Sequence, residues 1–144
     1  MEWAALITWV ITALFGFVML AIWLQRGGMQ QSDGGRINPP LILSHFLLAA
    51  GGLVLWIVYV IVDKDVLTWI AFAVLVVVAL IGWTMFFRWL RQRRGAPAAV
   101  GTASVAPAGG GAEQGFPVSV VTLHGIAAVT TVVLVFLTAI GVGG

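Results

Sequence analysis

Apolar residues fall into four long runs along the chain, separated by three polar segments. The runs cover residues 3–24, 41–62, 66–87 and 117–140, and none contains Asp, Glu, Lys or Arg. A bilayer core of about 30 Å requires around 20 apolar residues in a helix. Backbone groups in lipid must be satisfied within helices or closed barrels, and no run alternates with a period of two. Each run is therefore predicted to be a transmembrane helix.

The polar segments define how the four helices are connected. Residues 25–40 form a Gly-rich loop, and residues 63–65 are so few that the second and third helices must be antiparallel neighbours. Residues 95–115 are an Ala/Gly/Pro tract, which predicts a flexible linker. No internal repeat is obvious. The 144-residue chain is predicted to be one all-α domain, a four-helix transmembrane bundle with up-down topology.

The composition supports a membrane protein whose partner is the lipid bilayer. Hydrophobic residues make up 61% of the chain and charged residues 8%, with a mean hydropathy of +1.10. Soluble domains carry roughly a quarter charged residues. The absence of cysteine excludes disulfides and thiolate metal sites. A net charge of only +2 does not indicate nucleic-acid binding.

The basic residues predict the orientation in the membrane. The second loop, residues 63–65, holds only one basic residue, Lys64, which is flanked by two aspartates. An excess of Lys and Arg marks cytoplasmic loops, so the first and third loops are predicted to be cytoplasmic, with both termini outside a multi-pass cell-membrane protein. Tryptophans near both ends of the runs suit the two interfaces. The basic residues of the first and third loops are Arg26, Arg36, Arg88, Arg91, Arg93 and Arg94.

The only two histidines of the chain both lie within the apolar runs. His45 lies five residues past Pro40 and His124 seven past Pro117, at depths of about 7 and 10 Å on parallel helices. Such helices are diagonal in an up-down bundle, roughly 14 Å apart. Ionisable residues at membrane depth usually face the bundle interior and mark a functional site. The pair is predicted to hold one flat, metal-centred cofactor.

Small residues follow each histidine on the same helix face. Ala49 and Ala128 lie one turn further, and Gly52 and Thr131 two turns further. Small side chains would let a porphyrin plane approach the helix. They are also typical of ordinary helix packing in membranes.

The cytoplasmic rim offers arginines to the acidic groups of a haem. Arg36, Arg88 and Arg91 are the nearest candidates for its propionates, because guanidinium–carboxylate pairs are charge-assisted. The positive-inside rule also explains these arginines.

One histidine lies in each of two segments, residues 41–45 (Leu-Ile-Leu-Ser-His) and 121–125 (Val-Thr-Leu-His-Gly). Together with the four spans, this arrangement resembles that of b-type membrane cytochromes. Those proteins hold haem between helices through paired histidines. The resemblance implies one haem b near the cytoplasmic leaflet with His45 and His124 as iron ligands. It implies an electron carrier or accessory subunit rather than a stand-alone enzyme. Its partner would be a quinone or a larger redox complex, and homo- or hetero-oligomers are both open.

Other hypotheses remain for the two histidines. They are packing elements in a non-catalytic membrane subunit or assembly factor, or they bind copper(I) together with Met19 and Met85, which fall in the same layer. Zinc needs three or four ligands, and no carboxylate or cysteine lies at this depth. A proton-coupled transporter would need an intramembrane carboxylate, which the runs lack.

Overall fold

The computed structural model describes residues 1–30, 37–95 and 111–142. Four α-helices, each long and apolar enough to cross a membrane, form this part of the chain. The prediction of an all-α four-helix class is confirmed. The elements in order are α1 (Glu2–Gln25), η1 (Gly28–Gln30), α2 (Pro39–Val62), α3 (Asp65–Gly95), η2 (Ala112–Gly115) and α4 (Val118–Ala139), where η denotes a short 3-10 helix.

A tight turn joins α2 to α3. Asp63 ends α2 in the left-handed conformation, with φ of 50°, and its N–H donates to the Tyr59 carbonyl at 2.8 Å. Aspartate tolerates this conformation better than most residues. Only Asp63 and Lys64 separate the two helices, so they pack side by side in opposite directions.

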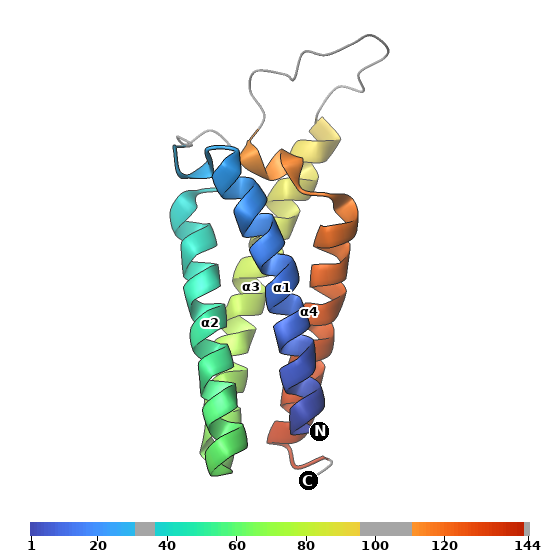
Figure 1. Cartoon of the computed structure of the whole chain (residues 1–144). Coiled ribbons are helices and arrows are strands. Elements are labelled where there is room, and N and C mark those ends of the chain that lie inside the picture. The colour runs from blue at the N-terminus through green and yellow to red at the C-terminus, as the bar shows by residue number, and fades with distance from the viewer. Residues whose placement is uncertain (31–36, 96–110, 143–144) are drawn as a thin grey trace.

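Helix α3 continues beyond the end of its apolar run. The run ends at Phe87, whereas the helix extends to Gly95. Arginine and glutamine are good helix formers, and long basic side chains reach water from a helix end. With 31 residues, α3 is about 46 Å long, well above the hydrocarbon thickness. Its last turns project beyond the other helices (Figure 1).

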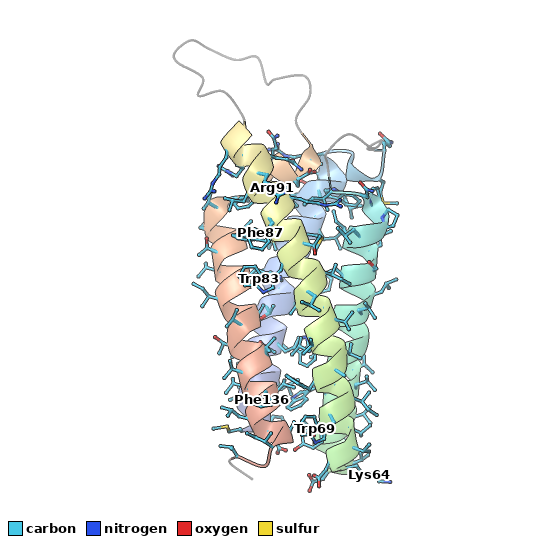
Figure 2. All side chains as sticks on the ribbon, turned by 180° about the vertical axis from the view of Figure 1, so that it is seen from behind. Lys64, Trp69, Trp83, Phe87, Arg91 and Phe136 are labelled. Atoms are coloured by element: carbon cyan, nitrogen blue, oxygen red, sulfur yellow. The ribbon has the colours of Figure 1, made fainter. Side chains whose placement is uncertain are left out.

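The helices form two closely packed pairs. Helix α1 packs most extensively on α4, and α2 on α3, while the contacts between these pairs are fewer. Helices α1 and α3 run in one direction and α2 and α4 in the other, so the N- and C-terminal ends lie at the same end as the α2–α3 turn (Figure 1). Figure 2 shows Lys64 at that end and Arg91 at the opposite one. The latter is called the basic end below.

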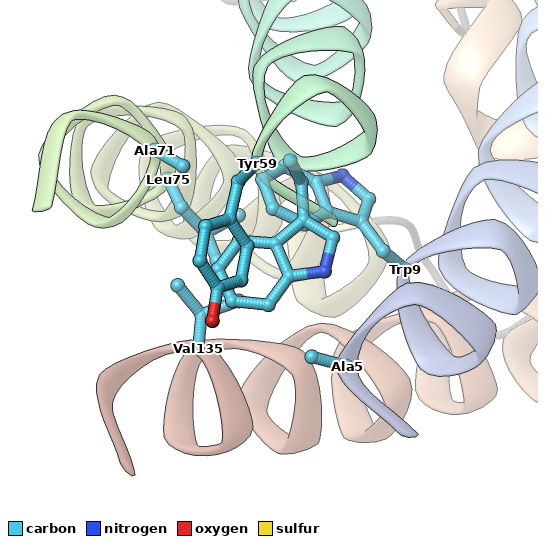
Figure 3. Packing of buried hydrophobic residues seen from close by; sticks show 7 residues of the cluster. Ala5, Trp9, Tyr59, Ala71, Leu75 and Val135 are labelled. Carbon is cyan, nitrogen blue, oxygen red and sulfur yellow. The ribbon is translucent and has the colours of Figure 1, made fainter. Parts of the chain in front are cut away.

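A buried cluster fills the half of the bundle near the termini (Figure 3). The Trp9 and Trp56 rings lie 6.3 Å apart, and Trp56 Nε1 donates to the Glu2 carbonyl at 3.3 Å. Every helix contributes, so this cluster joins both helix pairs. We call it the core cluster; its members are Ala5, Trp9, Trp56, Tyr59, Ala71, Leu75 and Val135.

The basic end is closed by short segments that cross the bundle. Glu113 of η2 is completely buried, and its carboxylate accepts a hydrogen bond from the Ile37 backbone N–H at 3.1 Å. Gly115 lies against the Arg26 guanidinium so closely that a Cβ would overlap it. Residues 111–115 therefore differ from the predicted flexible linker, because this buried carboxylate ties them to the start of α2. We call η1, Ile37 and η2 together the cap.

Candidate cofactor site

The structure brings His45 and His124 together from diagonal helices. Each lies six residues after the first residue of its helix, Pro39 of α2 and Val118 of α4, so both are about 9 Å along the axis. The ring centroids are 6.4 Å apart and the ring planes are inclined at 59°. The two imidazoles therefore meet in the bundle interior, at matched depth, in the half nearer the basic end.

Both rings are held in the same way by the helix next to them. His45 Nδ1 donates to the Val78 carbonyl of α3 at 3.1 Å, and His124 Nδ1 donates to the Thr12 carbonyl of α1 at 3.0 Å. A carbonyl oxygen can only accept, so each Nδ1 carries the proton and each Nε2 keeps its lone pair. Metal-bound histidines are usually oriented by this kind of second hydrogen bond.

A glycine stands against each imidazole. A Cβ at Gly82 would lie 3.2 Å from His45 Cε1, and a Cβ at Gly16 would lie 3.4 Å from His124 Cε1. Each glycine is four residues after the carbonyl that accepts the histidine bond, so bond and glycine lie on one helix face. We call His45, His124, Gly16 and Gly82 the histidine layer.

These two matching arrangements come from an internal repeat. Adding 66 to a residue number converts α1 positions into α3 positions, and nine of the 22 residues from Trp3 to Leu24 are then identical. The expectation of no internal repeat is wrong, because hydropathy alone hides the identities at single positions. The identical pairs are Trp3/Trp69, Ala5/Ala71, Val10/Val76, Ala13/Ala79, Leu14/Leu80, Gly16/Gly82, Met19/Met85, Trp23/Trp89 and Leu24/Leu90.

The second helix of each half repeats with another offset. Adding 79 aligns His45 with His124 and Ala49 with Ala128, along with three further identical pairs. The change from 66 to 79 reflects the longer second basic-end connection. The two helical hairpins thus resemble each other in sequence, and each contributes one histidine to the layer. The three further pairs are Val54/Val133, Leu55/Leu134 and Ile61/Ile140.

Burial changes along the bundle in three layers. Interior positions of the core cluster are buried, and so are the interior tryptophans Trp23 and Trp89 near the cap. All four residues of the histidine layer between them are partly exposed. The helices are therefore less tightly packed around the imidazoles than above or below them.

The small residues predicted beside the histidines divide between two layers. Ala49 and Ala128 are partly exposed, one turn from the imidazoles. Gly52 is buried against Trp9, where a Cβ would lie 3.0 Å from the indole. Thr131 is also buried, and its hydroxyl lies 3.4 Å from the Thr12 hydroxyl. Gly52 and Thr131 thus belong to the packing on the core-cluster side of the histidine layer.

Two of the three predicted arginines lie at the basic end. Arg88 and Arg91 are exposed on α3, and Arg36 lies outside the described residues. Sequence reasoning did not single out Arg93, which lies 5.1 Å from the Trp89 ring centroid and donates to the Phe116 carbonyl at 3.4 Å. It also missed Gly16 and Gly82, which an alignment of the chain with itself would have found.

The ligand set limits which metal chemistry the site can support. Within residues 1–30, 37–95 and 111–142, no three side chains of the His, Cys, Asp or Glu type gather as metal ligands, which argues against zinc. Metal–imidazole bonds of about 2.1 Å place two rings on opposite sides of a metal roughly 6 Å apart between centres. The observed 6.4 Å fits that arrangement.

Comparisons with protein-family models, with curated proteins and with solved structures find no match to this chain.

Proposed function

We propose that this chain is an integral membrane protein that binds one haem b between His45 and His124 and carries electrons. The observation that carries the proposal is the imidazole pair, with centroids 6.4 Å apart and each Nδ1 bonded to a backbone carbonyl. The carbonyl bonds leave Nε2 of both rings available to a metal. His45 and His124 would together hold the haem iron, and the separation of their rings agrees with this role.

The packing of the helix pairs supports a flat cofactor. His124 and its bonding partner belong to the α1–α4 pair, and His45 and its partner to the α2–α3 pair. A cofactor held by both rings would lie between the two pairs, where helix contacts are fewer. The partly exposed histidine layer, set between two buried layers, is consistent with such a space.

The ligand set favours electron transfer over oxygen chemistry. A haem iron between two imidazoles has no open coordination position and exchanges single electrons. The chain's own contribution is to hold both rings, through the Thr12 and Val78 carbonyls, and to keep water out with the core cluster and the cap. One haem near one face reaches only part of the way across a bilayer, so a quinone or a redox subunit would complete the path.

We also propose that the basic end faces the cytoplasm of a cell membrane and that both termini lie outside. The supporting observation is the charge distribution: Arg91 lies at one end and Lys64 at the other (Figure 2), and Arg88 and Arg93 lie within three residues of Arg91 on α3. The chain contains no cysteine, so single cysteines report position cleanly. Met29→Cys should react with an impermeant maleimide only in opened cells, and Lys64→Cys in intact cells. The reverse pattern would overturn the orientation.

The haem proposal is tested by purifying the protein in detergent and recording its absorption spectrum before and after addition of haemin. We expect an intense Soret band, sharp visible bands on dithionite reduction, and about one iron per chain. A colourless protein that does not respond to haemin would contradict the proposal and leave the histidines as packing elements.

Copper(I) is the second candidate, because Met19 and Met85 occupy equivalent positions in the repeat, three residues past Gly16 and Gly82. Copper by elemental analysis, without a Soret band and weakened in Met19→Leu and Met85→Leu, would favour that site instead.

A further inference from the structure

Two buried indole N–H groups near the cap have no hydrogen-bond acceptor in the described part of the chain. Trp23 is 0% exposed and Trp89 is 5% exposed, and Nε1 of both is buried without a partner. Buried tryptophans normally find an acceptor for this group, as Trp56 does at the Glu2 carbonyl. Two orphan donors in one small bundle therefore need an explanation.

The internal repeat makes the two tryptophans equivalent. Trp23 follows Gly16 by seven residues, and Trp89 follows Gly82 by the same number. Seven residues make about two helical turns, so each tryptophan shares a helix side with its glycine and lies roughly 10 Å nearer the basic end. The two unsatisfied donors thus share one depth, on the diagonal helices α1 and α3.

The two indoles are covered by different neighbours. Gly28 of the cap covers Trp23 so closely that a Cβ there would overlap the indole. The Arg93 guanidinium lies over the Trp89 ring, 5.1 Å from its centroid. A buried N–H donor without a partner in the protein forms its strongest hydrogen bond with an anionic acceptor.

We propose that Trp23 and Trp89 each donate one hydrogen bond to one of two carboxylates carried by the ligand of the histidine layer. This inference rests on the proposed function, since haem b carries two propionates on one edge. Two equivalent donors, one from each hairpin, match two equivalent acids. The exposed Arg88 and Arg91 would then contribute long-range attraction, while the buried indoles fix the orientation of the cofactor.

The test compares haemin with haemin dimethyl ester, whose propionates cannot be charged. Apo protein is titrated with each ligand, for the wild type, Trp23→Phe, Trp89→Phe and the double variant. Phenylalanine keeps an aromatic ring but removes the N–H. Trp83→Phe on the exposed side of α3 is the matched control.

Hydrogen bonds to charged groups are each worth about tenfold in affinity. We expect the preference for haemin over the ester to be about 100-fold greater in the wild type than in the double variant, and about tenfold greater in each single variant than in the double variant. Trp83→Phe should keep the wild-type ratio. Because the ratio is taken within one variant, a general loss of stability cancels.

An unchanged ratio in the double variant, with both ligands still bound, would overturn this inference alone. Failure of the wild type to bind either porphyrin would overturn the proposed function, and this inference with it.

Discussion

The core cluster and the histidine layer occupy neighbouring depths of one bundle but follow different rules. At equivalent positions of the two hairpins the core has exchanged its large residues, with Trp9 matching Leu75 and Trp56 matching Val135, although Ala5 and Ala71 are identical. The histidine layer has identical residues, His45 with His124 and Gly16 with Gly82. A packed core requires only that total volume be filled. A ligand site requires particular atoms at particular places, and the two identical pairs of the histidine layer agree with the proposed cofactor site.

The largest expected effect comes from removing one member of the histidine layer. His45→Ala and His124→Ala should each abolish the six-coordinate haem spectrum, to the same extent, because the hairpins supply equivalent ligands. Each deletion leaves room for a small molecule, so imidazole added to the buffer should restore the spectrum in part. Unequal loss, with one variant keeping a normal spectrum, would show that the iron is not shared by the two rings.

Truncating a residue of the core cluster should lower the stability of the protein and leave its haem spectrum unchanged. Trp56 is completely buried against Trp9 and Tyr59, and Trp56→Ala should lower the free energy of unfolding by about 3–5 kcal/mol. Thermal unfolding in detergent measures this, with the exposed Trp83→Ala as control. The protein that remains folded should keep the wild-type haem spectrum. A changed spectrum would mean that the two layers are not separable.

Adding a single methyl group should test how closely the histidine layer is packed. A Cβ at Gly82 would lie 3.2 Å from His45 Cε1, whereas a Cβ at Gly51 meets nothing within 4 Å. Crowding of this kind costs about 1–3 kcal/mol, so Gly82→Ala should weaken haem affinity by roughly 5- to 150-fold. Gly51→Ala should leave it unchanged. Both variants should fold, because alanine favours helix. Equal affinities in a haemin titration would contradict the contact.

The smallest effect is expected where the two layers meet. Thr12→Val removes the hydroxyl that lies 3.4 Å from the Thr131 hydroxyl, and interhelical bonds of this kind average about 0.6 kcal/mol. The backbone carbonyl that accepts from His124 remains. Unfolding should therefore change slightly and the haem spectrum not at all. A lost spectrum would show that the side chain, rather than the backbone, positions His124.

Hydropathy was sufficient to predict the helices, since a run of about 20 apolar residues has few alternatives in lipid. It failed at the ends of elements. Polar residues such as Arg91 continue α3 beyond the apolar run, and Glu113 orders a segment that composition alone indicates as linker. A buried contact between segments far apart in sequence leaves no trace in local composition.

The histidine pair could be predicted because ionisable groups are rare at membrane depth. Its supports could not be predicted in the same way. The acceptors for Nδ1 are backbone carbonyls of Thr12 and Val78, and a carbonyl has no side-chain signature. Gly16 and Gly82 were readable in principle, but only by comparing one half of the sequence with the other.

Electron paramagnetic resonance of the ferric protein, loaded with haemin and quantified for iron, tests the shared-ligand proposal most directly. One low-spin ferric signal per chain, typical of two imidazole ligands and converted to high spin in both His45→Ala and His124→Ala, is the predicted result. A high-spin signal in the wild type, or a low-spin signal that survives either substitution, would contradict it.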